Sequence, residues 1–266
     1  MNEPKKKFKI VTDTRARVVL PNALTLIGVC IGLSSINFAL NQNFTLAIIA
    51  VLVAAVIDGL DGRIARLIKG TSKVGKELDS LTDIISFGVA PAFIMYFWVL
   101  NTLGKVGWLI SLVYVVCIAL RLARFNINTG GEPSWRDNFF EGVPSPAGGI
   151  LVLTPLIYEV SGLGILNLNY QILVPSIFVV VSILLISKMP TYAFKKISVK
   201  RKTTVFLVFG VVLAFVLLFM FPFQTLVAAT SIYILSLPIS FFHYSKLDKK
   251  NKSENLFDHE EPEDFL

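Results

Sequence analysis

Residues 53–93 read VAAVIDGLDGRIARLIKGTSKVGKELDSLTDIISFGVAPAF. Both ends of this stretch are apolar enough to lie in a membrane, yet it contains four aspartates: Asp58, Asp61, Asp79 and Asp83. A bilayer solvates charge poorly, so ionisable groups at membrane depth are rare and mark functional sites. The stretch therefore predicts two membrane helices that share an acidic site.

The composition of the whole chain predicts a membrane protein. Of its 266 residues, 54% are hydrophobic and only 16% are charged, whereas about 25% are charged in soluble proteins. A helix that spans a membrane needs about 20 mostly apolar residues. We therefore expect an all-α integral membrane protein, a bundle of about eight transmembrane helices. The segments are Pro21–Leu40, Phe44–Leu60, Ser80–Leu100, Val106–Leu122, Ala147–Val160, Ile172–Ser187, Thr204–Phe221 and Thr225–Phe242.

The basic residues predict the orientation of these helices. If the N-terminus lies in the cytoplasm, every one of the 25 lysines and arginines except Lys105 falls on the cytoplasmic side. Cytoplasmic loops collect Lys and Arg. We therefore expect a multi-pass protein of the inner (cytoplasmic) membrane with both termini and the acidic site facing the cytoplasm. Residues 1–17 are predicted to form a basic arm, and residues 246–266 a charged, disordered tail.

The rarer residue types exclude some chemistry. Cys30 and Cys117 lie in separate apolar runs and form no CxxC motif. His243 and His259 have no neighbouring Cys or His that would complete a metal site. We expect neither catalysis by His or Cys nor a nucleic-acid partner.

The spacing of the aspartates predicts a metal site. Asp58 and Asp61 are three residues apart, and Asp79 and Asp83 are four apart. Positions i, i+3 and i+4 share one face of a helix, so an antiparallel helix pair brings all four carboxylates together. Converging carboxylates repel one another and need cations at neutral pH. Oxygen ligands suit hard ions, and two such ions can clamp a phosphate. We expect two divalent cations, Mg²⁺ or Mn²⁺, with Ca²⁺ as an alternative.

The residues beside the aspartates fit a phosphate ligand. Arg66 offers a planar fork of donors to phosphate oxygens. Several neighbours are small or carry a hydroxyl, although small residues in membrane helices are also common packing contacts. These neighbours are Gly62, Ala65, Thr71, Ser72 and Gly75.

The pattern from Asp58 to Asp83, D-x2-D-G-x2-A-R-x8-G-x3-D-x3-D, resembles the signature of the CDP-alcohol phosphotransferase family at every fixed position. The resemblance covers about Pro21 to Ile150. It implies a family domain over residues 18–245, with its catalytic half at about 18–150. It also implies a reaction in which a CDP-linked lipid donates its phosphatidyl group to a hydroxyl and CMP leaves.

The resemblance also implies roles for individual residues. Asp58, Asp61 and Asp79 bind the metals, and Asp83 is both a ligand and the catalytic base. The segment PNALT, Pro21–Thr25, is similar to a first-helix segment that lines the nucleotide site in the family. The residues expected to contact the CDP-lipid are Asn22, Thr25, Gly62, Ala65, Arg66, Thr71, Ser72 and Gly75.

Two later segments concern the acceptor. RLARFNINT, Arg121–Thr129, and FEGVPSPAGG, Phe140–Gly149, resemble segments of membrane-embedded phosphatidylserine synthases, where the common forms are RLARFN and GLPSPAA. This resemblance implies that L-serine is the acceptor. Arg121 and Arg124 are three apart and share a helix face, so they can bind the serine carboxylate, and Asn126 can position its polar groups. Alternatively, both arginines anchor the helix at the membrane interface.

Other functions stay open at this point. A sibling enzyme would use glycerol 3-phosphate or choline as the acceptor. A cation transporter would use the aspartates as a relay, although a relay would place them at successive depths. A structural membrane protein has no positive sign in the sequence. For the leading hypothesis, the expected partners are CDP-diacylglycerol, L-serine, the lipid bilayer and, by family resemblance, a second copy of the chain.

Overall fold

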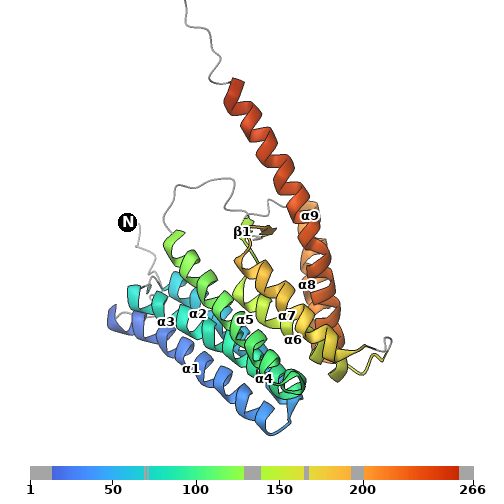
Figure 1. The fold of residues 1–266 in the computed structure, drawn as a ribbon. Coiled ribbons are helices and arrows are strands. Elements are labelled where there is room, and N and C mark those ends of the chain that lie inside the picture. Colours follow the sequence, from blue (N-terminus) through green and yellow to red (C-terminus); the bar gives the residue numbers. More distant parts are fainter. Residues whose placement is uncertain are drawn as a thin grey trace, which may run out of the picture. The chain divides into compact units, whose positions relative to one another are not determined.

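The computed structural model describes residues 14–68, 70, 72–128, 139–164, 168–192 and 201–257. Within these ranges the chain is mainly helical (Figure 1) and forms two compact units. The first unit holds the described residues up to 128 together with 145–186, and the second holds 139–144 and the described residues from 187 onwards.

The first unit is built only from helices. An unbroken helix from Lys73 to Trp98 consists of α3, a π-helical segment called η1, and α4. The elements are α1 (Thr14–Leu40), α2 (Phe44–Leu67), α3 (Lys73–Asp83), η1 (Ile84–Val89), α4 (Ala90–Trp98), the 3-10 turn η2 (Leu100–Leu103), α5 (Lys105–Asn128), α6 (Ser145–Val160) and α7 (Tyr170–Ile186).

The second unit contains two short strands and two helices. They are β1 (Phe139–Glu141), β2 (Pro190–Tyr192), α8 (Arg201–Met220) and α9 (Pro222–Phe257). The strands are antiparallel, with Phe140 opposite Thr191. Our all-α expectation did not include this strand pair.

Five helices among the described residues are long and apolar enough to cross a membrane. They are Val19–Leu40, Phe44–Leu67, Lys73–Trp98, Lys105–Ile127 and Pro222–Leu247, while α6 and α7 are apolar but shorter. Helices occupy all eight predicted segments, which confirms a helical membrane protein. The number of spans and the cytoplasmic position of the termini stay predictions.

The core of the first unit surrounds η1. Pro91 has no N–H, so the carbonyl of Phe87, four residues earlier, has no α-helical partner. The Tyr114 hydroxyl on α5 donates to this carbonyl at 2.7 Å. Phe87, Tyr114 and Phe178 are all fully buried. Gly149 lets α6 approach closely, because a Cβ there would lie 3.2 Å from the Phe87 backbone.

The chain ends differ from their prediction. Disorder was expected from residue 246, but α9 continues to Phe257. Residues 246–257 contain neither Gly nor Pro and several helix-forming residues, so the apolar part of α9 extends into them. Helix α1 begins at Thr14, inside the predicted arm. Residues 1–13 and 258–266 of the arm and tail lie outside the described residues.

Candidate metal and phosphate site

A tight turn joins the two helices that carry the aspartates. The N–H of Gly70 donates to the Ala65 carbonyl at 2.9 Å and closes the end of α2. The Ser72 hydroxyl accepts from the Gly75 N–H at 2.9 Å and caps the start of α3. The predicted helical segments end at Leu60 and resume at Ser80, which implies a basic loop between them. Its basic side chains lie mostly on the helices instead: Arg63 and Arg66 on α2, Lys73 and Lys76 on α3.

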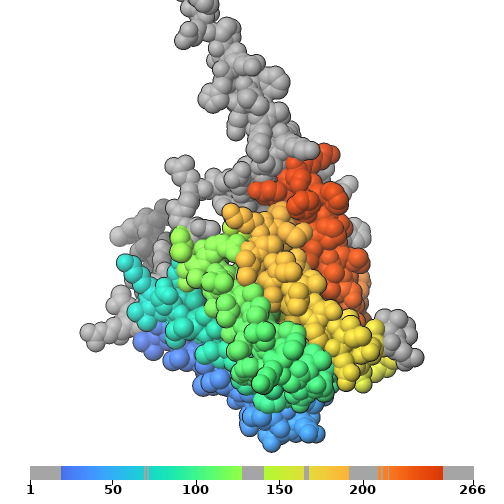
Figure 2. All heavy atoms as spheres, viewed as in Figure 1, coloured from blue at the N-terminus to red at the C-terminus, as the bar shows by residue number. Residues whose placement is uncertain are grey.

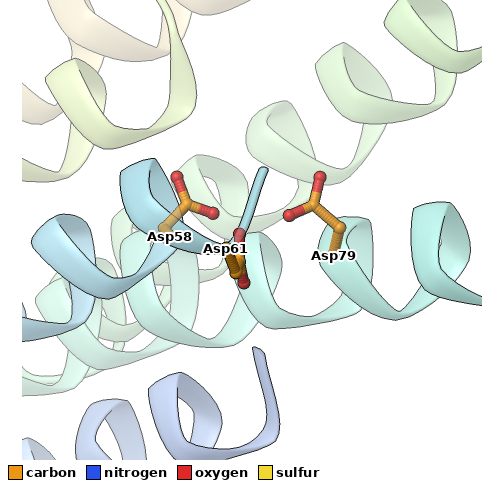
Figure 3. Close-up of side chains that lie close together, drawn as sticks. All are labelled: Asp58, Asp61 and Asp79. Carbon is orange, nitrogen blue, oxygen red and sulfur yellow. The ribbon is translucent and has the colours of Figure 1, made fainter. Parts of the chain in front are cut away.

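Three aspartates form a compact group of oxygen atoms. Asp58 and Asp61 come from α2 and Asp79 from α3, and one carboxylate oxygen of each lies within 4.8 Å of the others. Figure 3 shows Asp58 and Asp79 projecting to the same side, with Asp61 between them. Carboxylate oxygens are the ligands that hard divalent cations prefer. The group fits such an ion in donor type and proximity.

Asp61 is fixed from α1. The Thr25 hydroxyl lies 2.6 Å from Asp61 Oδ2 and 3.0 Å from the Pro21 carbonyl, so it can donate to either. Asp61 is only 3% exposed. A carboxylate buried to this degree needs hydrogen-bond partners, and the hydrogen bond from the Thr25 hydroxyl sets its orientation.

Asp83 lies one turn beyond Asp79 and outside the three-oxygen group. Its carboxyl group is next to that of Asp58, and the guanidinium of Arg121 is within electrostatic reach. Its Oδ1 atom is buried and has no hydrogen-bond partner among the described residues. A buried acceptor atom of this kind suits a group that receives a proton from a bound hydroxyl.

A cleft of about 490 Å³ lies beside the aspartates. Its wall includes Asp61 and Asp79 but neither Asp58 nor Asp83. Six of the residues predicted to contact the CDP-lipid line it: Asn22, Thr25, Gly62, Ala65, Ser72 and Gly75. Arg66 does not; its Nε donates at 3.0 Å to the Gly62 carbonyl of its own helix. Thr71 lies outside the described residues.

The cleft also contains residues that sequence reasoning missed. Gly70, Lys73 and Lys76 line it, together with Pro21, which begins the PNALT segment that was already expected there. We had counted the two lysines only as basic residues of the cytoplasmic side. Their spacing held a signal, because Lys76 is three residues before Asp79 and therefore shares its helix face.

The two signature glycines meet different surroundings. A Cβ at Gly75 would lie 2.8 Å from Asn22 Oδ1 and 3.1 Å from Ser72 Oγ, so this position is filled by neighbours. A Cβ at Gly62 would meet no atom within 4 Å. Gly62 is therefore not needed for helix packing among the described residues, and its missing side chain leaves the backbone open to the cleft.

The predicted acceptor residues on α5 have three separate partners. Arg121 Nη1 donates to Ser145 Oγ on α6 at 2.8 Å, and Arg124 Nη2 donates to the Ile186 carbonyl on α7 at 2.7 Å. Asn126 Nδ2 donates to Ser80 Oγ on α3 at 2.9 Å. Figure 2 shows α5, in green, between α3 in teal and α7 in yellow-orange. Of these three residues, Arg121 is the one whose charge acts on an aspartate, Asp83.

Comparison with known proteins places these features in a family. The family model described as CDP-alcohol phosphatidyltransferase matches residues 18–186, which end where α7 ends. A protein of Helicobacter pylori (strain 26695) named CDP-diacylglycerol–serine O-phosphatidyltransferase is 36% identical over 218 residues, 82% of this chain and 88% of that protein.

Shorter matches carry the same name. The Mycobacterium leprae protein is 46% identical over 137 residues, 51% of this chain and 45% of that protein. The Bacillus subtilis protein is 34% identical over 154 residues, 57% of this chain and 84% of that protein. The chain thus spans about half the length of the mycobacterial relatives that it matches.

Proposed function

Because the chain belongs to the CDP-alcohol phosphatidyltransferase family, we propose that it transfers the phosphatidyl group of CDP-diacylglycerol to the hydroxyl of L-serine, giving phosphatidylserine and CMP. The observation that carries this proposal is the group of Asp58, Asp61 and Asp79 oxygens beside a cleft lined by the signature residues. The names of the Helicobacter and Bacillus relatives support serine as the acceptor.

The cleft is the proposed binding site of the CDP-lipid. Its polar side chains, including Asn22, Thr25 and Ser72, offer hydrogen bonds to the nucleotide. Lys73 and Lys76 add positive charge for the two phosphates. The open backbone at Gly62 gives a phosphate room to approach the helix. The cleft is formed by α1, α2 and α3. Helices α1 and α2 are apolar along most of their length, and the polar helix α3 continues into the apolar part of the Lys73–Trp98 span, so the acyl chains can stay in the bilayer.

The aspartates are the proposed ligands of two divalent cations, Mg²⁺ or Mn²⁺. Asp58, Asp61 and Asp79 would hold them, with Asp83 as a further ligand at the Asp58 end. When bound, such cations neutralise the pyrophosphate and the charge of the departing CMP. The small residues Gly62 and Ala65 keep bulky side chains away from the face of α2 that lines the cleft.

Asp83 is the proposed general base. The serine oxygen forms a bond to the β-phosphorus of the donor, the one that carries the diacylglycerol, and the bond from this phosphorus to the oxygen of CMP breaks. The serine hydroxyl proton passes to Asp83, whose Oδ1 has no partner among the described residues. We propose that the acceptor approaches at the end of α5, the part of the helix that carries Arg121, Arg124 and Asn126.

We also propose that the site faces the cytoplasm at the inner membrane and that the protein forms a homodimer. The distribution of basic residues supports the first statement and the family resemblance the second. Protease accessibility of the C-terminal end of α9 in sealed inverted vesicles tests the orientation, and cross-linking in the membrane tests the dimer.

The activity is tested by supplying purified protein with CDP-diacylglycerol and one acceptor at a time: serine, glycerol 3-phosphate, choline or inositol phosphate. We expect CMP release and phosphatidylserine, identified by mass spectrometry, with serine and Mg²⁺ or Mn²⁺, and none after chelation. If a lipid product forms with another acceptor and not with serine, that acceptor takes the place of serine in the proposal. If the protein conducts cations in proteoliposomes but transfers no phosphatidyl group, it is a transporter and the proposed activity is wrong.

A further inference from the structure

We infer that Arg121 and Ser145 form the subsite for the carboxylate of an amino-acid acceptor, and that Arg124 and Asn126 hold α5 in place without touching the acceptor. The inference rests on the proposed function and specifies which residues bind the acceptor. It assigns a role to Ser145, which neither the signature nor the spacing of the arginines identifies.

The surroundings of Arg121 suit an anionic ligand. Arg121 is 8% exposed and Ser145 is 1% exposed, so both groups lie inside the helix bundle. The bond from Arg121 Nη1 to Ser145 Oγ fixes one edge of the guanidinium. A guanidinium matches a carboxylate through two parallel N–H donors, and this match depends on its orientation. Because Ser145 accepts from Arg121, its own hydroxyl proton can be donated to a second oxygen.

The position of the pair relative to Asp83 also fits. Arg121 is within electrostatic reach of Asp83, the proposed base. Asp61 and Asp79 line the nucleotide cleft, whereas Asp83 and Arg121 do not. An in-line displacement requires the attacking oxygen and the leaving group on opposite sides of phosphorus. An amino acid with a hydroxyl on its β-carbon carries both of the groups that these residues would bind, a hydroxyl for Asp83 and a carboxylate for Arg121.

Arg124 has a different task. Its Nη2 donates at 2.7 Å to the carbonyl of Ile186, the last residue of α7. The last carbonyls of a helix have no partner within the helix, and a cation is favoured beside them. Arg124 therefore caps α7 and fastens α5 to it.

Asn126 fastens the other side of α5. Its amide donates to Ser80 Oγ at 2.9 Å, and its backbone carbonyl accepts from Lys76 Nζ at 3.3 Å. Both partners are on α3, where Ser80 follows Asp79 directly. Asn126 is thus a positioning residue for the aspartate helix.

The test uses the purified full-length protein, saturating CDP-diacylglycerol and two acceptors, L-serine and L-serine methyl ester, which lacks the carboxylate charge. The readout is the ratio of kcat/KM for serine to kcat/KM for the ester. We expect wild-type protein to favour serine, and S145A and R121K each to lower the ratio by about tenfold or more, the loss expected for one hydrogen bond to a charged group. S145T, which keeps the hydroxyl, should recover much of the ratio.

Two controls separate this role from a general effect on the fold. Ser111 is also on α5 and 4% exposed, but its hydroxyl bonds the Gly107 carbonyl of its own helix at 3.0 Å, so S111A should keep the ratio. R124Q should keep it as well and lower the melting temperature. If wild-type protein does not use serine, the proposed function fails. If wild-type protein prefers serine but S145A and R121K keep that preference, or R124Q loses it, this inference is overturned.

Discussion

The aspartates of α2 and α3 and the polar residues at the end of α5 both follow helical spacing. The aspartates converge on one site, whereas the polar residues of α5 point to different helices. Asp58, Asp61 and Asp79 come from two helices and gather their oxygens within 4.8 Å. The polar residues of α5 come from one helix and reach α6, α7 and α3 separately. Convergence therefore depends on a second helix that presents matching groups, and spacing on one helix does not ensure it.

The difference has a consequence for what each region contributes. A convergent group of like charges destabilises the protein until a cation or substrate compensates it. In a divergent group, such as the polar residues at the end of α5, each side chain has a hydrogen-bond partner within the protein. Such a group mainly adds stability. Substitutions in the first region should change activity, and most of those in the second should change the melting temperature.

The largest expected effect is that of Asp83→Asn. Removing the proposed base should lower kcat by about 10²- to 10⁴-fold, while Asp58, Asp61 and Asp79 remain in place. The measurement is CMP release, with Mn²⁺ binding followed by electron paramagnetic resonance. D79N is the comparison, because it removes a member of the three-oxygen group and should weaken Mn²⁺ binding more than D83N does. A wild-type kcat in D83N would show that the base lies elsewhere.

The next effect concerns the two glycines of the convergent region. Gly62→Ala should raise the melting temperature slightly, since alanine favours a helix by up to about 1 kcal/mol over glycine, but should raise the KM for CDP-diacylglycerol by about tenfold if phosphate approaches that backbone. Gly75→Ala should lower both stability and activity, because its Cβ would crowd Asn22 and Ser72. Thermal unfolding in detergent and initial rates distinguish the two. Unchanged KM in G62A would remove Gly62 from the donor site.

Arg124→Gln tests the divergent region. Loss of the bond to the Ile186 carbonyl should cost about 1–2 kcal/mol of stability, seen as a lower melting temperature. The serine-to-ester preference should stay within about twofold of wild type, a margin well below the tenfold loss of one such bond. An equal loss of stability and serine preference would place Arg124 in the acceptor site after all.

The smallest expected effect is that of Ser80→Ala. Removing the acceptor of the Asn126 amide should cost about 0.5–1.5 kcal/mol, the usual net value of one hydrogen bond. Ser176→Ala is the matched control, because the Ser176 hydroxyl bonds only the Ile172 carbonyl within α7 in the described contacts. If both variants melt at the same temperature, the link between α5 and α3 adds no stability.

The convergent region could be predicted from sequence because its information is local. Both aspartate pairs have helical spacing, and only a short stretch of chain separates them, so their helices must be neighbours. The basic residues between them misled us about the loop. Long side chains such as Arg66 and Lys76 can extend from a helix into the interface, so the helices continue where a loop was expected.

The divergent region could not be predicted in the same way. The partner of Arg124 is a backbone carbonyl on α7, and no residue type identifies a carbonyl. Ser145 lies in the FEGVPSPAGG segment, just before the predicted Ala147–Val160 helix, but its pairing with Arg121 depends on how α5 and α6 pack. The β1–β2 pair is equally non-local, because residues 49 to 53 positions apart meet there.

The π-helical segment after Asp83 has a consequence for the whole Lys73–Trp98 helix. Each residue of an α-helix advances the direction of its side chain by about 100°, and the wider turn at η1 shifts that phase. A single helical wheel drawn through this span would therefore misplace either the carboxylate face upstream or the apolar face of Ala90 and Ile94 downstream. The span therefore consists of two α-helical parts, α3 and α4, whose side-chain directions are rotated relative to each other at η1.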